Sequence, residues 1–207
     1  MNSPTVRTRP ADTEKRLRKD DWEVREVPLS VARGLVQAYH YAKGGSNTRT
    51  YSHGLFKKGG SECLGVAWWI PPTRGAAQAT HPEDWQGVLA LSRLVVAPGV
   101  PKNACTFLLS RSVKMIPKSR WPVLITYADQ WRGHDGGIYR ASGWTYEGLT
   151  NPEATYTIGG VMTARKAGGK TRTHGEMLAL GAVFEGRHAK HKFTLRRGRR
   201  HVTEIPT

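Results

Sequence analysis

The sequence VLITYADQWRGHDGGIYRASGW runs from Val123 to Trp144. Its first three residues are apolar and predict a buried strand. The rest combines carboxylate, imidazole, phenol, indole and guanidinium groups with four glycines. Polar groups at the end of a core strand are where α/β proteins place binding and catalysis. The stretch therefore predicts a functional site at the tip of a central strand.

Turn residues divide the rest of the chain into short apolar segments. Residues 88–96 (VLALSRLVV) predict a second buried strand, and Asn103 is placed to cap a helix that Pro117 ends. The other predicted elements are a strand at 22–27, a helix from Ser30 to Tyr39, a hairpin of strands 51–57 and 62–70, a strand at 122–128, a short helix at 137–142, and strands at 144–148 and 155–163. This order predicts an α/β (α+β) protein, with a mixed sheet and helices on its faces.

Composition limits the partners. The 207 residues carry 32 Lys and Arg against 16 Asp and Glu, a net charge of +16. Such an excess favours association with nucleic acid or an anionic membrane. No apolar run approaches the length of a membrane span, and residues 1–21 lack the apolar core of a signal peptide. Cys63 and Cys105 share no metal-ligand spacing, so we expect two reduced thiols in a cytoplasmic protein.

The element order resembles the GCN5-related N-acetyltransferase (GNAT) fold, on the residues LSRLVVAP (91–98), the helix after them, and VLITYAD…GIYRASGW. That resemblance implies a mostly antiparallel central sheet flanked by helices. In GNAT proteins a glycine-containing loop between the central strand and the next helix binds the pyrophosphate of acyl-CoA. Here this loop, residues 98–104, has one glycine, and Pro101 has no N–H to donate. The loop therefore argues against acetyl-CoA as cofactor.

A narrower resemblance rests on His40-Tyr41, Leu91-Ser92-Arg93, Pro101-Lys102-Asn103 and Ala128-Asp129…Gly136…Ile138-Tyr139-Arg140-Ala141. Over roughly residues 22–150 the chain is similar to the Mom family of bacteriophage DNA-modification proteins. The basic Lys190-His191-Lys192-Phe193 also resembles the ending of such proteins. Mom proteins convert adenine in DNA to an N6-carbamoylmethyl form, an anti-restriction device for phage DNA. The resemblance implies an adenine-modifying transferase in the host cytoplasm, iron as a candidate cofactor near His40, Tyr41 and 126–129, and a donor of the added group that the sequence does not name.

On this basis the chain divides into a flexible N-terminal arm (1–21), a GNAT-like catalytic domain (22–164) and a basic C-terminal extension (165–207) that packs on the domain or continues it. Modifying an exocyclic amine of DNA requires the base to leave the stack, aromatic faces to hold it, and a group that manages the proton. Our catalytic candidates are His40, Tyr41, Asp129 and Tyr139, the last from the resemblance alone.

Two of these candidates have other interpretations. Asp129 is a general base, a metal ligand or a turn cap. His40 and Asp129 are the metal-ligand candidates, although their spacing does not make a site without the fold.

Candidates for substrate binding come from aromatic, histidine and arginine positions. They are Tyr51, His53, Trp68, Ser92, Arg93, Trp131 and Arg140. Alternation sends one of Trp68 and Trp69 into the core, and His53 has a purely structural alternative. Arg93 is charged inside an apolar strand, so it either binds a phosphate or carboxylate or forms an ion pair across the sheet.

Residues 165–201 carry eleven Lys and Arg against Glu176 and Glu185. This excess predicts binding to double-stranded DNA, with a solvated charged surface as the alternative. The predicted contacts are Lys190, Lys192, Arg196, Arg197, Arg199 and Arg200. A membrane partner is not expected, and a homodimer is one option for the assembly. Two other functions stay open: a conventional GNAT acyltransferase acting on a protein, tRNA or small amine, and a noncatalytic DNA-binding phage protein.

Overall fold

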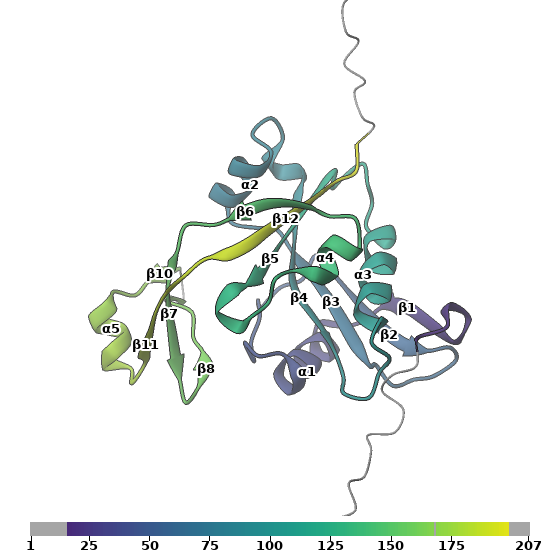
Figure 1. Cartoon of the computed structure of the whole chain (residues 1–207), viewed down its shortest axis with the longest axis horizontal. Helices are drawn as coiled ribbons and strands as arrows, with labels where there is room; N and C mark the ends of the chain where they lie inside the picture. The colour runs from purple at the N-terminus through teal and green to yellow at the C-terminus, as the bar shows by residue number, and fades with distance from the viewer. Residues whose placement is uncertain (1–15, 168, 199–207) are drawn as a thin grey trace, which may run out of the picture.

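The computed structural model describes residues 16–167 and 169–198. Its main sheet has seven strands in the order β1-β2-β3-β4-β5-β12-β6 (Figure 1). They are β1 (Trp22–Glu26), β2 (Tyr51–Lys57), β3 (Gly65–Ile70), β4 (Val88–Val96), β5 (Val123–Asp129), β12 (Lys190–Arg196) and β6 (Thr145–Leu149). Every neighbouring pair is antiparallel except β4 and β5. The predicted mixed, mostly antiparallel sheet is confirmed.

Helices cover both faces of this sheet. On one face, α1 (Leu29–Tyr39) packs Ala32 and Val36 against Trp68, and α2 (Arg74–Thr80) packs beside it. On the other face, α3 (Ala104–Met115) buries its apolar side against Trp69, next to the short α4 (Gly137–Ala141). Alternation does send Trp68 and Trp69 to opposite faces. Because both faces are covered, the two indoles are 1% and 0% exposed.

The parallel pair β4 and β5 is short. Its ladder joins only Val88–Ala90 to Val123–Ile125. Beyond it, Ser92 is the extra residue of a β-bulge, because Leu91 pairs with Trp69 and Arg93 with Trp68. The bulge turns Arg93 toward the α1 face. Beyond these three pairs, the C-terminal parts of β4 and β5 are not paired with each other, and both carry polar residues.

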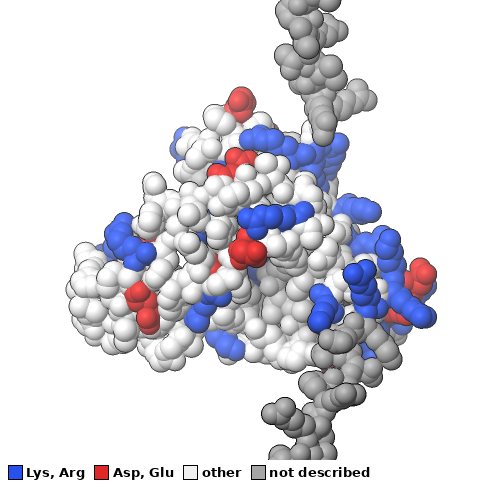
Figure 2. All heavy atoms as spheres, in the orientation of Figure 1, with Lys and Arg blue, Asp and Glu red and all other residues white. Residues whose placement is uncertain are grey.

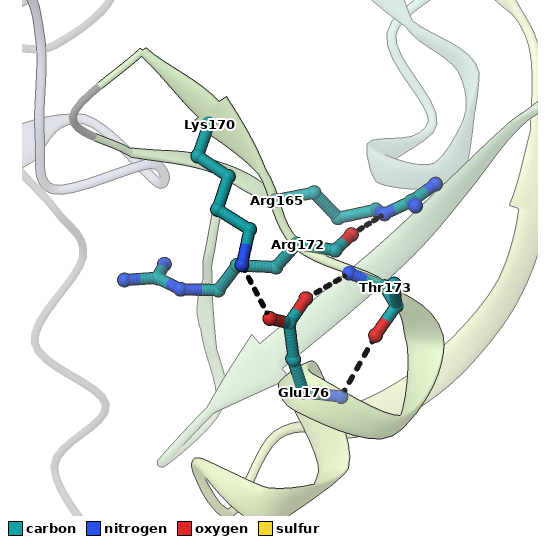
Figure 3. A network of polar contacts seen from close by, with 5 residues as sticks. All are labelled: Arg165, Lys170, Arg172, Thr173 and Glu176. Carbon is teal, nitrogen blue, oxygen red and sulfur yellow. Dashed lines mark hydrogen bonds and ion pairs between the residues drawn. The ribbon is translucent and has the colours of Figure 1, made fainter.

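Residues beyond β6 first build a small lobe and then return to the sheet (Figure 1). The lobe contains the sheet of β7 (Glu153–Ile158), β8 (Val161–Met162) and β11 (Val183–His188), the hairpin of β9 (Lys166–Ala167) and β10 (Lys170–Thr171), and α5 (His174–Ala179). Glu176 of α5 accepts from Lys170 Nζ at 2.8 Å and completes a capping box with Thr173. These contacts tie the hairpin to α5 (Figure 3). The chain then enters the main sheet as β12, between β5 and β6.

Several local predictions were wrong in detail. Ser30 lies inside α1, whose N-cap is Pro28. The Asn103 side chain does not cap α3; its Oδ1 accepts a hydrogen bond from the Leu17 backbone at 2.7 Å. The strand expected at 155–163 is broken at Gly159-Gly160, both with positive φ, which separates β7 from β8. Within the described residues no helix is both long and apolar enough to cross a bilayer.

Arg197, a predicted DNA contact, instead forms hydrogen bonds within the protein. Its Nη1 donates to Val113 O and Ile116 O, each at 3.0 Å, and its Nε and Nη2 donate to Trp121 O. The guanidinium therefore satisfies carbonyls at the C-terminal end of α3 and in the loop after it. These hydrogen bonds argue against Arg197 as a DNA contact.

We expect Arg197→Ala to lower the free energy of unfolding by about 2–3 kcal/mol, because several partly buried carbonyls lose a charged donor. The neighbouring Arg196 is exposed and donates to Thr80 O at 2.9 Å. Arg196→Ala should therefore cost about 1 kcal/mol or less. Urea unfolding of both variants measures the difference. Equal costs would show that Arg197 does not stabilise α3.

Candidate active site

Three segments far apart in the sequence meet at the tip of β5. His40 and Tyr41 follow α1, Arg93 lies on β4, and Asp129 ends β5. Tyr41 OH donates to Asp129 Oδ2 at 3.4 Å, and the rings of His40 and Tyr41 stack with centroids 4.4 Å apart. The fold thus assembles three of the four predicted catalytic residues, together with Arg93. We call His40, Tyr41, Arg93 and Asp129 the tip cluster.

Asp129 is a nearly buried carboxylate, 5% exposed, at the point where β5 gives way to the 3-10 turn η3 (Gln130–Arg132). Its backbone carbonyl accepts from His134 N, which closes the turn. Burial, and then the Asp129 charge, raise the pKa of Tyr41 to about 12. Tyr41 is therefore a neutral phenol at neutral pH and donates to the carboxylate.

His40 is a neutral imidazole at neutral pH. Burial, and then the charges of Arg93, His134 and Lys43, lower the pKa of His40 to about 4. The backbone N–H of Ala42 donates to Nδ1 at 3.1 Å. A neutral ring that accepts at Nδ1 carries its proton on Nε2. His40 therefore presents an N–H donor rather than a free basic nitrogen.

Arg93 is a partly buried cation whose hydrogen bonds go to neutral oxygens. Its Nε donates to Gly44 O at 2.8 Å, and its Nη1 donates to Ser92 O at 2.7 Å and to Ser92 Oγ at 3.4 Å. Burial lowers the pKa of the Arg93 guanidinium. No carboxylate among the described residues pairs with it. Of the two sequence-based interpretations, the ion pair across the sheet is wrong, and binding of an anion stays a prediction.

An aromatic and cationic flank borders the tip cluster. The Arg132 guanidinium lies 4.3 Å from the Trp131 ring centroid and 5.4 Å from that of Tyr41. The Trp131 ring lies 5.7 Å from that of His188 in β11, which brings the lobe to the edge of the site. Trp131 was predicted, whereas Arg132 and His188 were missed. Arg132 stood inside the opening stretch, but nothing in the sequence pointed to His188.

Other predicted residues lie in the core or elsewhere on the surface. His53 is 1% exposed, and its Nδ1 is 2.7 Å from Ser112 Oγ of α3. Tyr51 stacks on His53 and accepts from Trp121 Nε1 at 3.2 Å. Both belong to the α3 face, on the other side of the sheet from the tip cluster, so neither joins that cluster.

Trp68, Tyr139 and Arg140 also differ from expectation. Trp68 is covered by α1 and by the loop at Gly45, and its Nε1 donates to Thr48 O at 3.2 Å, so it offers no face to a base. Tyr139 is 9% exposed in the α3-side core, and burial raises its pKa. Arg140 is exposed and donates to Asp135 O at 2.6 Å.

The described part of the chain does not fit a bound iron. It holds no group of three or more His, Cys, Asp or Glu side chains arranged for a metal ion. His40 stacks flat on Tyr41, and the Asp129 carboxylate faces the Tyr41 hydroxyl. The expectation of iron held by His40 and Asp129 has no support in this geometry.

The loop between β4 and α3 does not fit acyl-CoA either. Pro101 has no N–H, and its carbonyl accepts from Ala104 N at the start of α3. Leu17, 7% exposed, packs in the same core cluster as Ala104 and binds Asn103 through its backbone. A cavity of about 510 Å³ adjoins this loop at 98–101, but Glu62 lines it beside Lys57.

A bulged β4 that briefly pairs in parallel with β5, with helices on both faces, defines the GNAT class of fold. An acetyltransferase of Salmonella typhimurium solved with acetyl-CoA shares it at 9% identity and TM-score 0.52, covering 90% of this chain and 99% of that one. The ribosomal-protein-S5-alanine acetyltransferase of Vibrio fischeri does so at 8% identity and TM-score 0.52, covering 90% and 98%. The ribosomal-protein-S18-alanine N-acetyltransferase of Escherichia coli does so at 10% identity and TM-score 0.50, covering 89% and 99%.

Within this class, residues 21–201 match the Mom protein family, and the chain belongs to that family. The match extends well past residue 150 and includes the basic residues 190–193. A search of curated proteins found no match to the chain. The structural likeness, at these identities, establishes the fold.

Burial of His53 predicts acid sensitivity. Burial lowers the pKa of His53 to about 4, below the 6.5 of an unfolded histidine. The neutral ring therefore favours the folded state fully above pH 6.5, and this stability is lost as pH falls from 6.5 toward 4. We expect the free energy of unfolding to drop by roughly 2 kcal/mol between pH 7 and pH 5 from His53, with a smaller, solvent-screened contribution from His40.

Urea unfolding at the two pH values, on the native protein and on His53→Gln, tests this expectation. The variant should be less stable at pH 7 but should lose less on acidification. An unchanged pH dependence in the variant would refute the assignment to His53.

Proposed function

We propose that this protein modifies adenine in DNA, adding a carbamoylmethyl group to N6, and that it protects phage DNA from restriction in the host cytoplasm. Membership in the Mom protein family supports the DNA substrate. The observation that carries the proposal is the tip cluster, in which a nearly buried carboxylate and a phenol meet at the end of a central strand. A GNAT-type fold supports a group transfer.

The target amine needs help because its lone pair is delocalised into the purine ring. In the proposed reaction the adenine leaves the stack, and its amino group reaches Asp129. N6 attacks the methylene carbon of an activated carbamoylmethyl donor. The N6–C bond forms as the bond from that carbon to the leaving group breaks, and the N6 proton passes to the Asp129 carboxylate.

Tyr41, His40 and Arg93 have supporting roles in this proposal. The Tyr41 hydroxyl orients the carboxylate through its hydrogen bond. His40, neutral with its proton on Nε2, donates a hydrogen bond to substrate. Arg93 lacks a carboxylate partner and stabilises negative charge on the departing group.

Double-stranded DNA is the proposed partner, and the structure changes which cations we assign to it. Lys190 pairs across the β5–β12 ladder with Asp129, and Lys192 with Tyr127, so both side chains emerge on the Asp129 face. Cations on the viewed face are dispersed, with groups near the end of β12 and over α3 (Figure 2). Arg196 stays a proposed contact, while Arg199 and Arg200 lie outside the described residues.

The loop between β4 and α3 argues against the conventional acyltransferase, and the tip cluster argues against a purely DNA-binding role. Acetyl-CoA should leave the thermal unfolding temperature unchanged. A clear acetyl-CoA-dependent rise would favour the acyltransferase.

Asp129→Asn and His40→Ala should each reduce adenine modification at least a hundredfold, because one removes the proton acceptor and the other a donor. The readout is nucleoside digestion and mass spectrometry of DNA from expressing cells. The matched control is Asp20→Asn. Asp20 is an exposed carboxylate in η1 (Lys19–Asp21), distant in sequence from the tip cluster, so this variant should keep full activity. Full activity in both site variants would remove the tip cluster from the reaction.

Binding to duplex DNA should weaken steeply with salt. For about three phosphate contacts, affinity should fall roughly 40-fold between 50 and 200 mM salt. Lys190→Gln with Lys192→Gln should lower the slope of log affinity against log salt by about 2. Fluorescence anisotropy with a labelled duplex gives both slopes. An identical slope in the variant would show that β12 does not contact the backbone.

A further inference from the structure

A second cavity lies on the α1 face, next to the tip cluster, with a volume of about 290 Å³. Its lining comes from α1, from the loop after it and from β3: Arg33, Val36, Gln37, Lys43, Gly44, Gly45 and Trp68. The loop lies directly on the Trp68 indole, since a Cβ added at Gly45 would fall 2.6 Å from the ring. Trp68 also donates to Thr48 O, so the indole both supports this loop and forms part of the cavity wall.

The charged side chains that line this cavity are all positive. Arg33 donates to Asn47 Oδ1 at 3.1 Å, and Lys43 donates to Ala38 O at 2.8 Å, so both cations have only neutral acceptors. No carboxylate lines the cavity. Lys43 also has φ of 49°, the only positive φ of a non-glycine residue in the described chain. Backbone strain of this kind is found at ligand sites.

The same loop holds the third cation. Gly44 O accepts from Arg93 Nε, so Arg93 adjoins the backbone that forms the cavity wall. The N–H groups of Gly44 and Gly45 have no hydrogen-bond partner among the described residues. Arg33, Lys43, Gly44 and Gly45 all line the cavity and are all exposed. Cations and backbone N–H groups without a protein partner are the elements from which proteins build anion sites.

We propose that this cavity is a subsite for a phosphate or carboxylate group, bound by Arg33, Lys43 and the N–H groups of Gly44 and Gly45 beside Arg93. The anion belongs either to the donor of the transferred group or to the DNA backbone next to the target adenine. Assigning its source rests on the proposed function; the subsite itself does not. The cavity beside the β4–α3 loop lacks this character, because its lining includes the carboxylate of Glu62 as well as Lys57.

The probe is inorganic pyrophosphate, titrated calorimetrically into the full chain at low salt. Arg33→Gln combined with Lys43→Gln should weaken its binding at least tenfold. Lys114→Gln removes an exposed cation from α3 on the opposite face and should leave binding unchanged. Absence of saturable binding to the native protein, or equal binding to the double variant, would overturn the subsite. Circular dichroism and urea unfolding establish that each variant is folded.

Duplex DNA then identifies the source of the anion. If it is a backbone phosphate, the duplex competes with pyrophosphate and binds the double variant at least tenfold more weakly than the native protein. If it belongs to the donor, duplex affinity falls by no more than the Lys114→Gln control, while adenine modification in cells falls at least tenfold. Unimpaired modification together with unimpaired duplex binding would refute both sources. A native protein that binds pyrophosphate but leaves adenine unmodified would refute the proposed function alone.

Discussion

The short parallel ladder between β4 and β5 is the constraint on which the site depends. The ladder covers only three residue pairs. The last residues of β4 and β5 are therefore not paired with each other, and their side chains can be polar. The bulge at Ser92 then changes the facing of β4, so that Arg93 reaches the α1 face instead of the α3 core. Asp129, on the last position of β5, emerges on that same face, where Tyr41 meets it.

A partly buried guanidinium without a carboxylate partner among the described residues lies on this face. The carbonyls of Gly44 and Ser92 accept hydrogen bonds from Arg93 and offset part of the cost of its partial burial. Burial, and then the charges of Arg93, His134 and Lys43, lower the pKa of His40 and keep the ring neutral. A positive, partly dehydrated surface beside a neutral imidazole and a carboxylate suits an anionic substrate, whose arrival would supply the missing charge.

The sequence predicts the central elements well because their signals are local. The apolar run at 123–125 and the polar stretch after it placed both β5 and Asp129, and the turn at Lys58–Ser61 placed the hairpin. Predictions of side-chain exposure were less successful, because exposure depends on elements distant in sequence. Alternation separates Trp68 from Trp69, but only the paths of α1 and α3 show that neither is exposed. The charge of Arg197 says nothing about whether it meets phosphate or, as here, the end of α3.

The insertion of β12 changes the meaning of the basic C-terminal segment. Phe193 of this strand is fully buried, and Gly136 approaches so closely that an added Cβ would lie 2.2 Å from the ring. The turn after Asp129 is therefore seated on β12. Without β12, β5 would be an edge strand, and the carboxylate would lose its cross-strand neighbour Lys190. Lys190 and Lys192 belong to a strand that also shapes the site, so the proposed DNA contacts and the position of the proposed catalytic carboxylate depend on one strand.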